Sequence, residues 1–262
     1  MRTRLIVIGV LSRPALVGVT LLGLAGCSGK PRPLDNLPPP RPPATEAAVP
    51  TLRVVDAALA GGAPALALQM SEDILARRPR DVGAMVRRGD ALFELGRRDD
   101  AAASYTHALG LDRDNIPARI GLARTRLATD PAAAESILTE IVAREPHNAA
   151  AENDLGIARD LQGRHVDAET AYRAAISVTP ENPAIQINYG LSLALAGKPA
   201  EALRILRPIA ENPDATPRAR QDLAVALTLS GDTAGAEKLL GKDLSADQVA
   251  DAIAGYQALG TK

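Results

Sequence analysis

Small residues recur at a spacing of about 34 positions through most of this 262-residue chain. Residues 149–182 show the unit most clearly, with Gly156 at the eighth place, Gly163 at the fifteenth and Ala168 at the twentieth. A fixed period of this length is typical of solenoids, in which each unit buries its apolar face only by stacking on its neighbours. The period therefore constrains the fold more than composition does.

Applying this period to the chain predicts six units. They span residues 48–81, 82–115, 116–148, 149–182, 183–216 and 217–244. The twentieth place holds alanine in every unit, where a small side chain lets two helices approach closely. These alanines are Ala67, Ala101, Ala134, Ala168, Ala202 and Ala236. The third unit is one residue short, because Asp130-Pro131 replaces a turn glycine there and can start the second helix as N-cap and first residue.

Each unit reads as two helices joined by a short turn. Five turns carry a glycine, which suits the left-handed conformation that ends a helix. They are Gly62, Gly96, Gly163, Gly197 and Gly231. Abundant Ala and Leu, with only 2% aromatic residues, also favour helix over sheet. Pro208 falls inside a predicted helix, so we expect a kink or an early end there.

Residues 245–262 predict one further helix and a tail. Ser245 and Gln248 have the spacing of a capping box at its start. The apolar residues that follow share one stripe, which we expect to cover the exposed side of the last unit. They are Val249, Ile253, Tyr256 and Leu259. Six helical pairs and this cap give thirteen predicted helices.

The unit resembles the tetratricopeptide repeat (TPR) in its length and in Leu155-Gly156, Gly163, Ala168, Tyr172 and Pro180. The resemblance implies an all-α, right-handed TPR solenoid of about six helix–turn–helix repeats plus a C-terminal capping helix. It also implies a scaffold that binds other proteins.

The N-terminus has the pattern of a secretory signal peptide over residues 1–26, with a positive start and an apolar run that ends in small residues. Leu24-Ala25-Gly26-Cys27 resembles the bacterial lipobox, and Cys27 is the only cysteine in the chain. The resemblance implies a lipid attached to Cys27, and Ser28 after it favours the outer membrane, at its periplasmic face. The alternative is a plain signal peptide with a chance cysteine.

Residues 27–47 contain seven prolines and predict an extended tether rather than helix or sheet. About 20 residues in the polyproline conformation would reach roughly 60 Å. The segment serves either as a spacer between the bilayer and the repeats, which we favour, or as a polyproline ligand for a partner domain.

No catalytic spacing is present in the sequence, so we expect no enzyme, no cofactor, no metal and no small-molecule substrate. The histidines His107, His147 and His165 fall on predicted surfaces or turns and lack metal-ligand spacing. A net charge of −1 argues against nucleic acid as a partner. The expected partners are proteins, with the membrane contacted through the lipid.

In TPR proteins, places 2, 5, 9 and 12 of the first helix face the inner groove. The resemblance therefore implies a mostly apolar partner groove that suits an apolar or amphipathic segment. Its residues are Leu52, Val86, Phe93, Ile120, Leu127, Asn153, Ile157, Ile187, Leu191, Gln221 and Val225. The alternative is that these side chains pack between neighbouring helices.

The C-terminal segment 218–259 resembles the end of the Flp pilus assembly lipoprotein of the tight-adherence (Tad) secretion system. The matching residues are Arg220, Leu223-Ala224, Ala226-Leu227, Gly231, Ala236-Glu237, Asp243-Leu244, Tyr256 and Leu259. This resemblance implies a role in assembling or localising the secretin pore. The alternatives are a type IV pilus pilotin, a β-barrel assembly factor, a cell-wall-enzyme adaptor or, in another class, a regulatory module of an enzyme.

Overall fold

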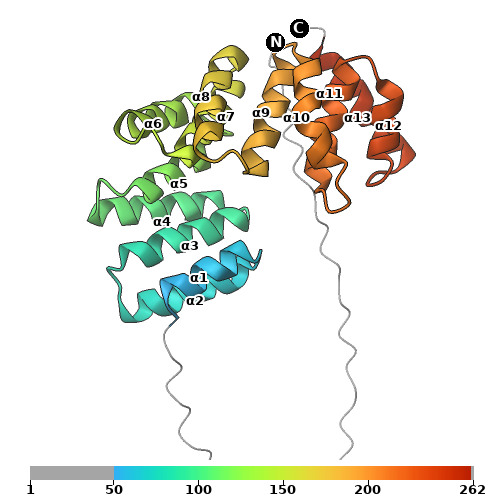
Figure 1. The fold of residues 1–262 in the computed structure, drawn as a ribbon. Helices are drawn as coiled ribbons and strands as arrows, with labels where there is room; N and C mark the ends of the chain where they lie inside the picture. Colours follow the sequence, from blue (N-terminus) through green and yellow to red (C-terminus); the bar gives the residue numbers. More distant parts are fainter. Residues whose placement is uncertain (1–49, 261–262) are drawn as a thin grey trace, which may run out of the picture. The chain divides into compact units, whose positions relative to one another are not determined.

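The computed structural model describes residues 50–260 of the chain. The chain divides between Ala47 and Ala48 into two units, and the described residues belong to the second. The predictions for the signal peptide, Cys27 and the tether lie outside the described residues. The helices follow one another in a stack that Figure 1 shows from α1 to α13. They are α1 (Leu52–Ala60), α2 (Pro64–Arg77), α3 (Val82–Glu94), α4 (Arg98–Leu111), α5 (Ile116–Arg126), α6 (Pro131–Arg144), α7 (Ala149–Asp160), α8 (His165–Val178), α9 (Pro183–Leu195), α10 (Pro199–Ala210), α11 (Pro217–Leu229), α12 (Thr233–Leu240) and α13 (Ala246–Leu259).

These thirteen helices confirm the predicted all-helical fold for residues 50–260. They form six hairpins, α1–α2 to α11–α12, followed by α13. Within residues 50–260, the five predicted turn glycines are the residues of positive φ, with values from 68° to 92°. A left-handed backbone at the end of the first helix reverses the chain within a few residues, and glycine adopts it without strain.

Most first helices begin at a side chain that caps their free backbone amides. Asp81, Asn115, Asn148, Asn182 and Thr216 each accept a hydrogen bond from the first turn of the helix that follows. Such a cap contributes about 1 kcal/mol. The boundary between successive units is therefore fixed locally as well as by packing.

The small residues of the period lie where helices touch. All six twentieth-place alanines are completely buried. At the eighth place, Gly156 lies against the ring of Tyr172, and an added Cβ would come within 2.7 Å of that ring. Gly190 lies in the same way against Leu206, at 2.6 Å. The eighth place is thus small because it receives the bulky side chain of the second helix.

The hairpins stack by a repeated pattern of contacts. Each second helix packs on the first helix of its own unit and on the first helix of the next unit, and successive first helices also touch. Helix α13 packs on α11 and α12, in the place that the first helix of a seventh unit would take. The hydrophobic core consequently runs along the stack as a series of clusters.

The departures from the period have local causes. In the short third unit, Asp130 caps α6 by accepting from the Ala133 amide at 3.0 Å, as expected. Pro208 lies inside α10, which has 12 residues where α2, α4, α6 and α8 have 14, so the helix ends early.

The predicted stripe of α13 is only partly correct. Val249, Ile253 and Tyr256 are buried, but Leu259 is 43% exposed, because α13 ends there and no further element covers it in the described chain. Among residues 50–260, no helix is both long and apolar enough to cross a membrane.

Candidate protein-binding face

The first helices of the six units form one continuous surface, which we call the A-helix face. Each of α1, α3, α5, α7 and α9 contacts the next first helix in the series, which ends at α11. Side chains on this surface come from all six units. It is therefore the surface on which a long partner segment could contact every repeat.

The predicted groove residues divide into two groups by burial. Val86, Ile120 and Val225 are buried, at 3%, 7% and 5% exposure, and they belong to the hydrophobic clusters. The others are partly exposed. These are Leu52, Phe93, Leu127, Asn153, Ile157, Ile187, Leu191 and Gln221. The first group is available to the core alone, whereas the second can also meet a partner.

The partly exposed apolar residues of the fourth and fifth units lie close together. Ile157 of α7 and Ile187 and Leu191 of α9 pack at the edge of the same hydrophobic cluster. By contrast, Phe93 of α3 lies near the other end of the stack, where the Arg98 guanidinium sits over its ring, 5.9 Å from the ring centre. Ile157, Ile187 and Leu191 therefore supply the apolar component of the A-helix face in the middle of the stack.

A series of charged side chains crosses the helices of the first four units. Arg87 of α3 donates to both carboxylate oxygens of Asp56 of α1, at 2.8 and 3.1 Å. Arg124 of α5 donates to Asp154 of α7 at 2.5 Å. Asp90 of α3 lies between these pairs. The signs alternate along the series, so each charge has opposite charges beside it.

Burial shapes the protonation of this series. Burial raises the pKa of Asp90, while the hydrogen bond from Tyr105 and the positive charge of Arg124 oppose the rise. Burial likewise raises the pKa of Asp154, and Arg124 again opposes it. Burial also raises the pKa of Tyr105, so this hydroxyl remains a donor to Asp90, at 2.7 Å.

Amide and guanidinium groups continue the polar contacts into the last units. Asn188 of α9 donates to Asn153 of α7 at 2.9 Å. Arg218 of α11 in turn donates to the other side of Asn188, at 2.7 Å to its amide oxygen. Three successive first helices are thus joined through side chains that remain partly or largely exposed.

The groove prediction missed most of these polar residues because it considered only places 2, 5, 9 and 12. The sixth place holds Arg53, Arg87, Asp154, Asn188 and Asp222 in five of the six units. A polar residue that recurs at one place of a helical repeat is the signal that would have shown them. Polar side chains such as Arg87 and Asn188 therefore lie on the A-helix face beside the predicted apolar residues, whereas Asp154 and Asp222 are buried.

A Ser–His–Asp grouping occurs at the end of α7, but its geometry is structural. Asp160 accepts from Tyr172, Ser192 and the Nδ1 side of His165, each at 2.8 Å. Ser192 bonds to the carboxylate rather than to the imidazole, and it is only 1% exposed. The hydroxyl is neither activated by the histidine nor open to a substrate. His107 and His147 are exposed, and residues 50–260 contain no group of three potential metal ligands.

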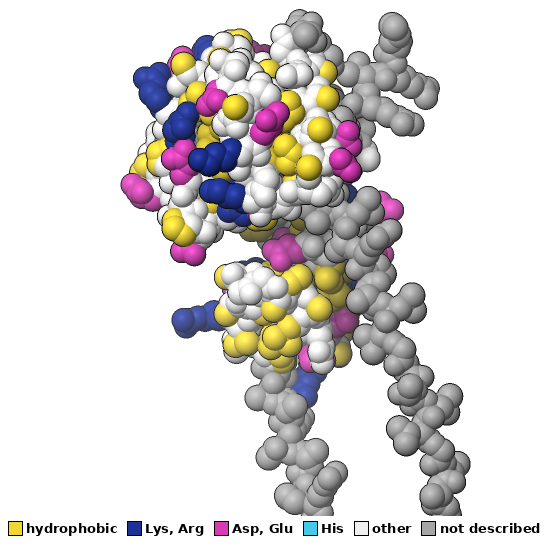
Figure 2. Space-filling view, turned by 90° about the vertical axis from the view of Figure 1, so that its right-hand side faces the viewer, with side chains coloured by type: hydrophobic (Ala, Val, Ile, Leu, Met, Phe, Trp, Pro, Cys, Tyr) yellow, Lys and Arg dark blue, Asp and Glu magenta, His cyan; other side chains and the backbone are white. Residues whose placement is uncertain are grey.

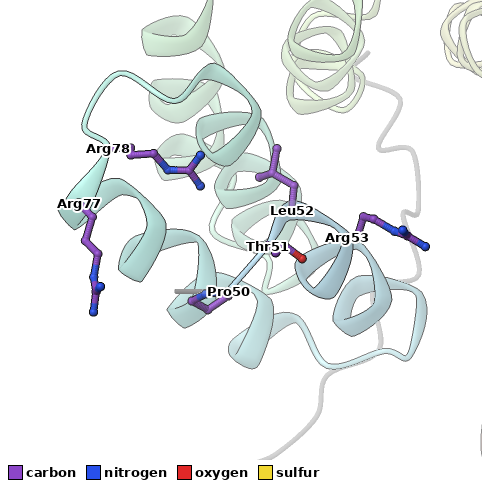
Figure 3. A pocket seen from close by; sticks show the side chains of 6 residues that line it. All are labelled: Pro50, Thr51, Leu52, Arg53, Arg77 and Arg78. Atoms are coloured by element: carbon purple, nitrogen blue, oxygen red, sulfur yellow. The ribbon is translucent and has the colours of Figure 1, made fainter. Parts of the chain in front are cut away.

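A shallow hollow lies where the chain enters α1. It is lined by Pro50, Thr51, Leu52, Arg53, Arg77 and Arg78. Figure 3 shows the three arginine side chains pointing in different directions rather than toward a common point. Arg78 also forms an ion pair with Asp81 at 3.1 Å. The hollow therefore lacks the convergent donors of an anion-binding site.

The surface near α12 and α13 carries both signs of charge. In Figure 2, Lys and Arg side chains lie beside Asp and Glu side chains, with hydrophobic side chains between them. This mixture agrees with the formal net charge of −1. It contrasts with the single-sign surface that nucleic-acid binding requires.

Comparison with known families decides the class of the protein. The tetratricopeptide repeat family matches residues 53–116, 128–183 and 162–215. The chain is a tetratricopeptide repeat protein. Comparison with curated proteins finds no match. Such repeat proteins are generally non-enzymatic scaffolds that bind other proteins.

Solved structures of TPR proteins are similar to this chain. TTC0263 from Thermus thermophilus is 25% identical, with a TM-score of 0.57, over 69% of this chain and all of that one. PilW, a type IV pilus biogenesis factor, is 18% identical, with a TM-score of 0.62, over 73% and 91% of the two chains. A TPR protein from Parabacteroides merdae is 15% identical, with a TM-score of 0.58, over 80% and 83%. These likenesses support the helical TPR solenoid.

Proposed function

We propose that this TPR protein is a lipid-anchored scaffold at the periplasmic face of a bacterial outer membrane, where it binds proteins that assemble the Flp pilus (Tad) machinery. The observation that carries its binding role is the A-helix face, to which all six units contribute. Its apolar side chains Ile157, Ile187 and Leu191 lie beside the polar series of Asn153 and Asn188. A surface of this kind suits an amphipathic segment.

The anchor and the pilus assignment rest on the two ends of the chain. Cys27 in Leu24-Ala25-Gly26-Cys27 is the expected lipid attachment site. At the other end, several of the residues that match the Tad lipoprotein make contacts within the last unit and α13. Arg220 binds Asp243 through two hydrogen bonds of 2.5 and 2.7 Å, and Ala236 and Tyr256 are buried. The residues that carry the resemblance therefore also stabilise the C-terminal end of the stack.

The proposed partner is the secretin through which Flp pili emerge. Affinity purification of the lipidated protein from its own membranes, after cross-linking, is expected to recover this secretin. Deleting the gene is expected to reduce the fraction of secretin that assembles into multimers. Normal secretin multimers and pili in the deletion strain would reject the assignment.

PilW supports a second candidate, because it has the same fold and is a type IV pilus biogenesis factor. The two candidates differ in the partner that is recovered. Purification of a type IV pilus secretin, with loss of type IV pili in the deletion strain, would favour the second. β-Barrel assembly proteins or cell-wall enzymes among the partners would favour the remaining adaptor functions.

Replacing Ile187 with aspartate is expected to weaken secretin capture by about 30-fold, the effect of losing a strong interface residue. A charge at this place opposes burial of an apolar partner segment. The matched control is Val166→Asp on α8, since Val166 is 72% exposed and lies outside the A-helix face. Pull-down titration gives the affinities, and thermal melting by circular dichroism verifies that both variants fold. Equal capture by the two variants would place the binding surface elsewhere.

A further inference from the structure

Asp222 is the one described residue with a buried side-chain oxygen or nitrogen that has no hydrogen-bond partner. It lies on α11 and is 8% exposed, and the unsatisfied atom is Oδ2. A buried carboxylate with an oxygen that accepts no hydrogen bond is costly in its charged form. The position therefore favours a protonated carboxyl group.

The neighbouring groups leave Oδ2 of Asp222 without a hydrogen bond. On its own helix, Arg218 forms an ion pair with Asp222, but its Nε is 3.6 Å from Oδ2, beyond hydrogen-bond distance, and the Arg218 side chain is 67% exposed. From α9, Asn188 accepts a 2.7 Å hydrogen bond from the same guanidinium, so Arg218 is shared between Asn188 and Asp222. The nearby Arg220 is paired with Asp243.

Across the interface between α11 and α13, Asp222 interacts electrostatically with Tyr256. Burial raises the pKa of Tyr256, and the charge of Asp222 raises it further. Tyr256 is one of the three buried residues of α13, together with Val249 and Ile253. The acidic residues Asp247 and Asp251 of α13 are exposed. None of the named groups facing Asp222 from α13 carries a positive charge.

We propose that α13 is a proton-sensitive cap, whose packing on α11 tightens when Asp222 is protonated and loosens when Asp222 ionises. Helix α13 suits this role because it is the last described helix and packs mainly on α11 and α12. Its release would uncover the end of the repeat stack. The cap would then respond to acidity through one side chain.

The direction of the effect follows from linkage. Burial raises the pKa of Asp222 from 3.8 to about 6 when α13 is packed, with Arg218 opposing the rise. In the released state the carboxyl group meets water, and its pKa returns toward the ordinary value. The packed state therefore binds the proton more tightly, so packing is strongest near pH 4 and weakens as the pH rises to about 6. The full change in the release equilibrium is about 100-fold.

Hydrogen exchange of the full mature chain tests this cap. Protection of α13 amides, corrected for intrinsic exchange rates, is expected to fall up to about 100-fold between pH 4 and pH 7. Helix α7 serves as the internal reference. In Asp222→Asn the protection of α13 should be independent of pH and, at pH 7, higher than in the wild type. Asp247→Asn, at an exposed acidic residue of α13 itself, should behave like the wild type.

Arg218→Gln provides a second, independent test at an exposed position. Removing this positive charge should raise the pKa of Asp222 further and move the midpoint of α13 release to higher pH. This result decides the question even if Asp222→Asn does not fold. The proposal would be overturned if the protection of α13 in the wild type did not depend on pH. It would also be overturned if Arg218→Gln did not change the pH midpoint of α13 release.

Discussion

Replacing Gly121 with valine is expected to divide thermal unfolding of the chain into two transitions. Gly121 of α5 lies directly on the ring of Tyr105, and any Cβ there would overlap ring atoms. The ring has little room to move, because Gly89 also lies against it and its hydroxyl donates to Asp90 at 2.7 Å. Tyr105 is 1% exposed and packs between the second and third units.

The energetic consequence is local to one interface. Overpacking of this kind costs about 3 kcal/mol. The stability of a repeat protein is approximately a sum of unit and nearest-neighbour terms, so the loss should uncouple α1–α4 from the rest of the stack. Thermal melts by circular dichroism should show the first transition at lower temperature, and hydrogen exchange should assign it to residues before Asp112.

The matched control for this variant is Gly110→Ala. Gly110 lies in α4 with open space around its Cα, so alanine should raise the free energy of unfolding by up to about 1 kcal/mol through helix propensity. A single transition in Gly121→Val at an unchanged midpoint would show that Tyr105 does not couple the two units.

Replacing Cys27 with serine is expected to move essentially all of the protein from the membrane fraction to the soluble periplasmic fraction. This follows from the proposed anchor, because several acyl chains at about 0.8 kcal/mol per buried methylene hold a protein stably on a bilayer, and no helix within residues 50–260 is long and apolar enough to cross one. Fractionation with immunoblotting measures the distribution. Mass spectrometry of the wild-type N-terminal peptide should find acyl groups on Cys27.

Ser28→Asp is the companion variant, since it leaves the lipid in place. It is expected to keep the protein membrane-bound but to shift it from the outer to the inner membrane. Wild-type protein with an unmodified N-terminus, or Cys27→Ser that remains in the membrane fraction, would contradict the anchor. Neither result would affect the repeat fold or the A-helix face.

The sequence predicts most of the helical architecture because local and periodic requirements coincide. Ala168 must be small where helices cross, and Gly163 must adopt positive φ where the chain turns. In the short unit, which lacks a turn glycine, Asp130 caps α6 and Pro131 is its first residue, so the second helix still begins there. Requirements of this kind recur every 34 residues, so one clear unit is enough to locate the others.

The groove was less predictable because burial depends on neighbours about 30 residues away. Ile120 and Ile187 both occupy the fifth place, yet the first is buried in the core and the second is partly exposed. The hydrogen bond between Asn153 and Asn188 could not be predicted for the same reason. Asn153 and Asn188 meet only after two units have stacked, at a sequence separation of 35.

The contacts between successive first helices have a mechanical consequence. In the described chain, the units touch through α1–α3, α3–α5, α5–α7, α7–α9 and α9–α11 along one edge, and side-chain pairs such as Arg87–Asp56 and Asn188–Asn153 reinforce that edge. Under tension this edge should keep its length, while the spacing between successive second helices, on the opposite edge, should vary. Binding points on the A-helix face would then keep a constant spacing while the rest of the stack deforms. A scaffold under load could in this way retain its partner in register.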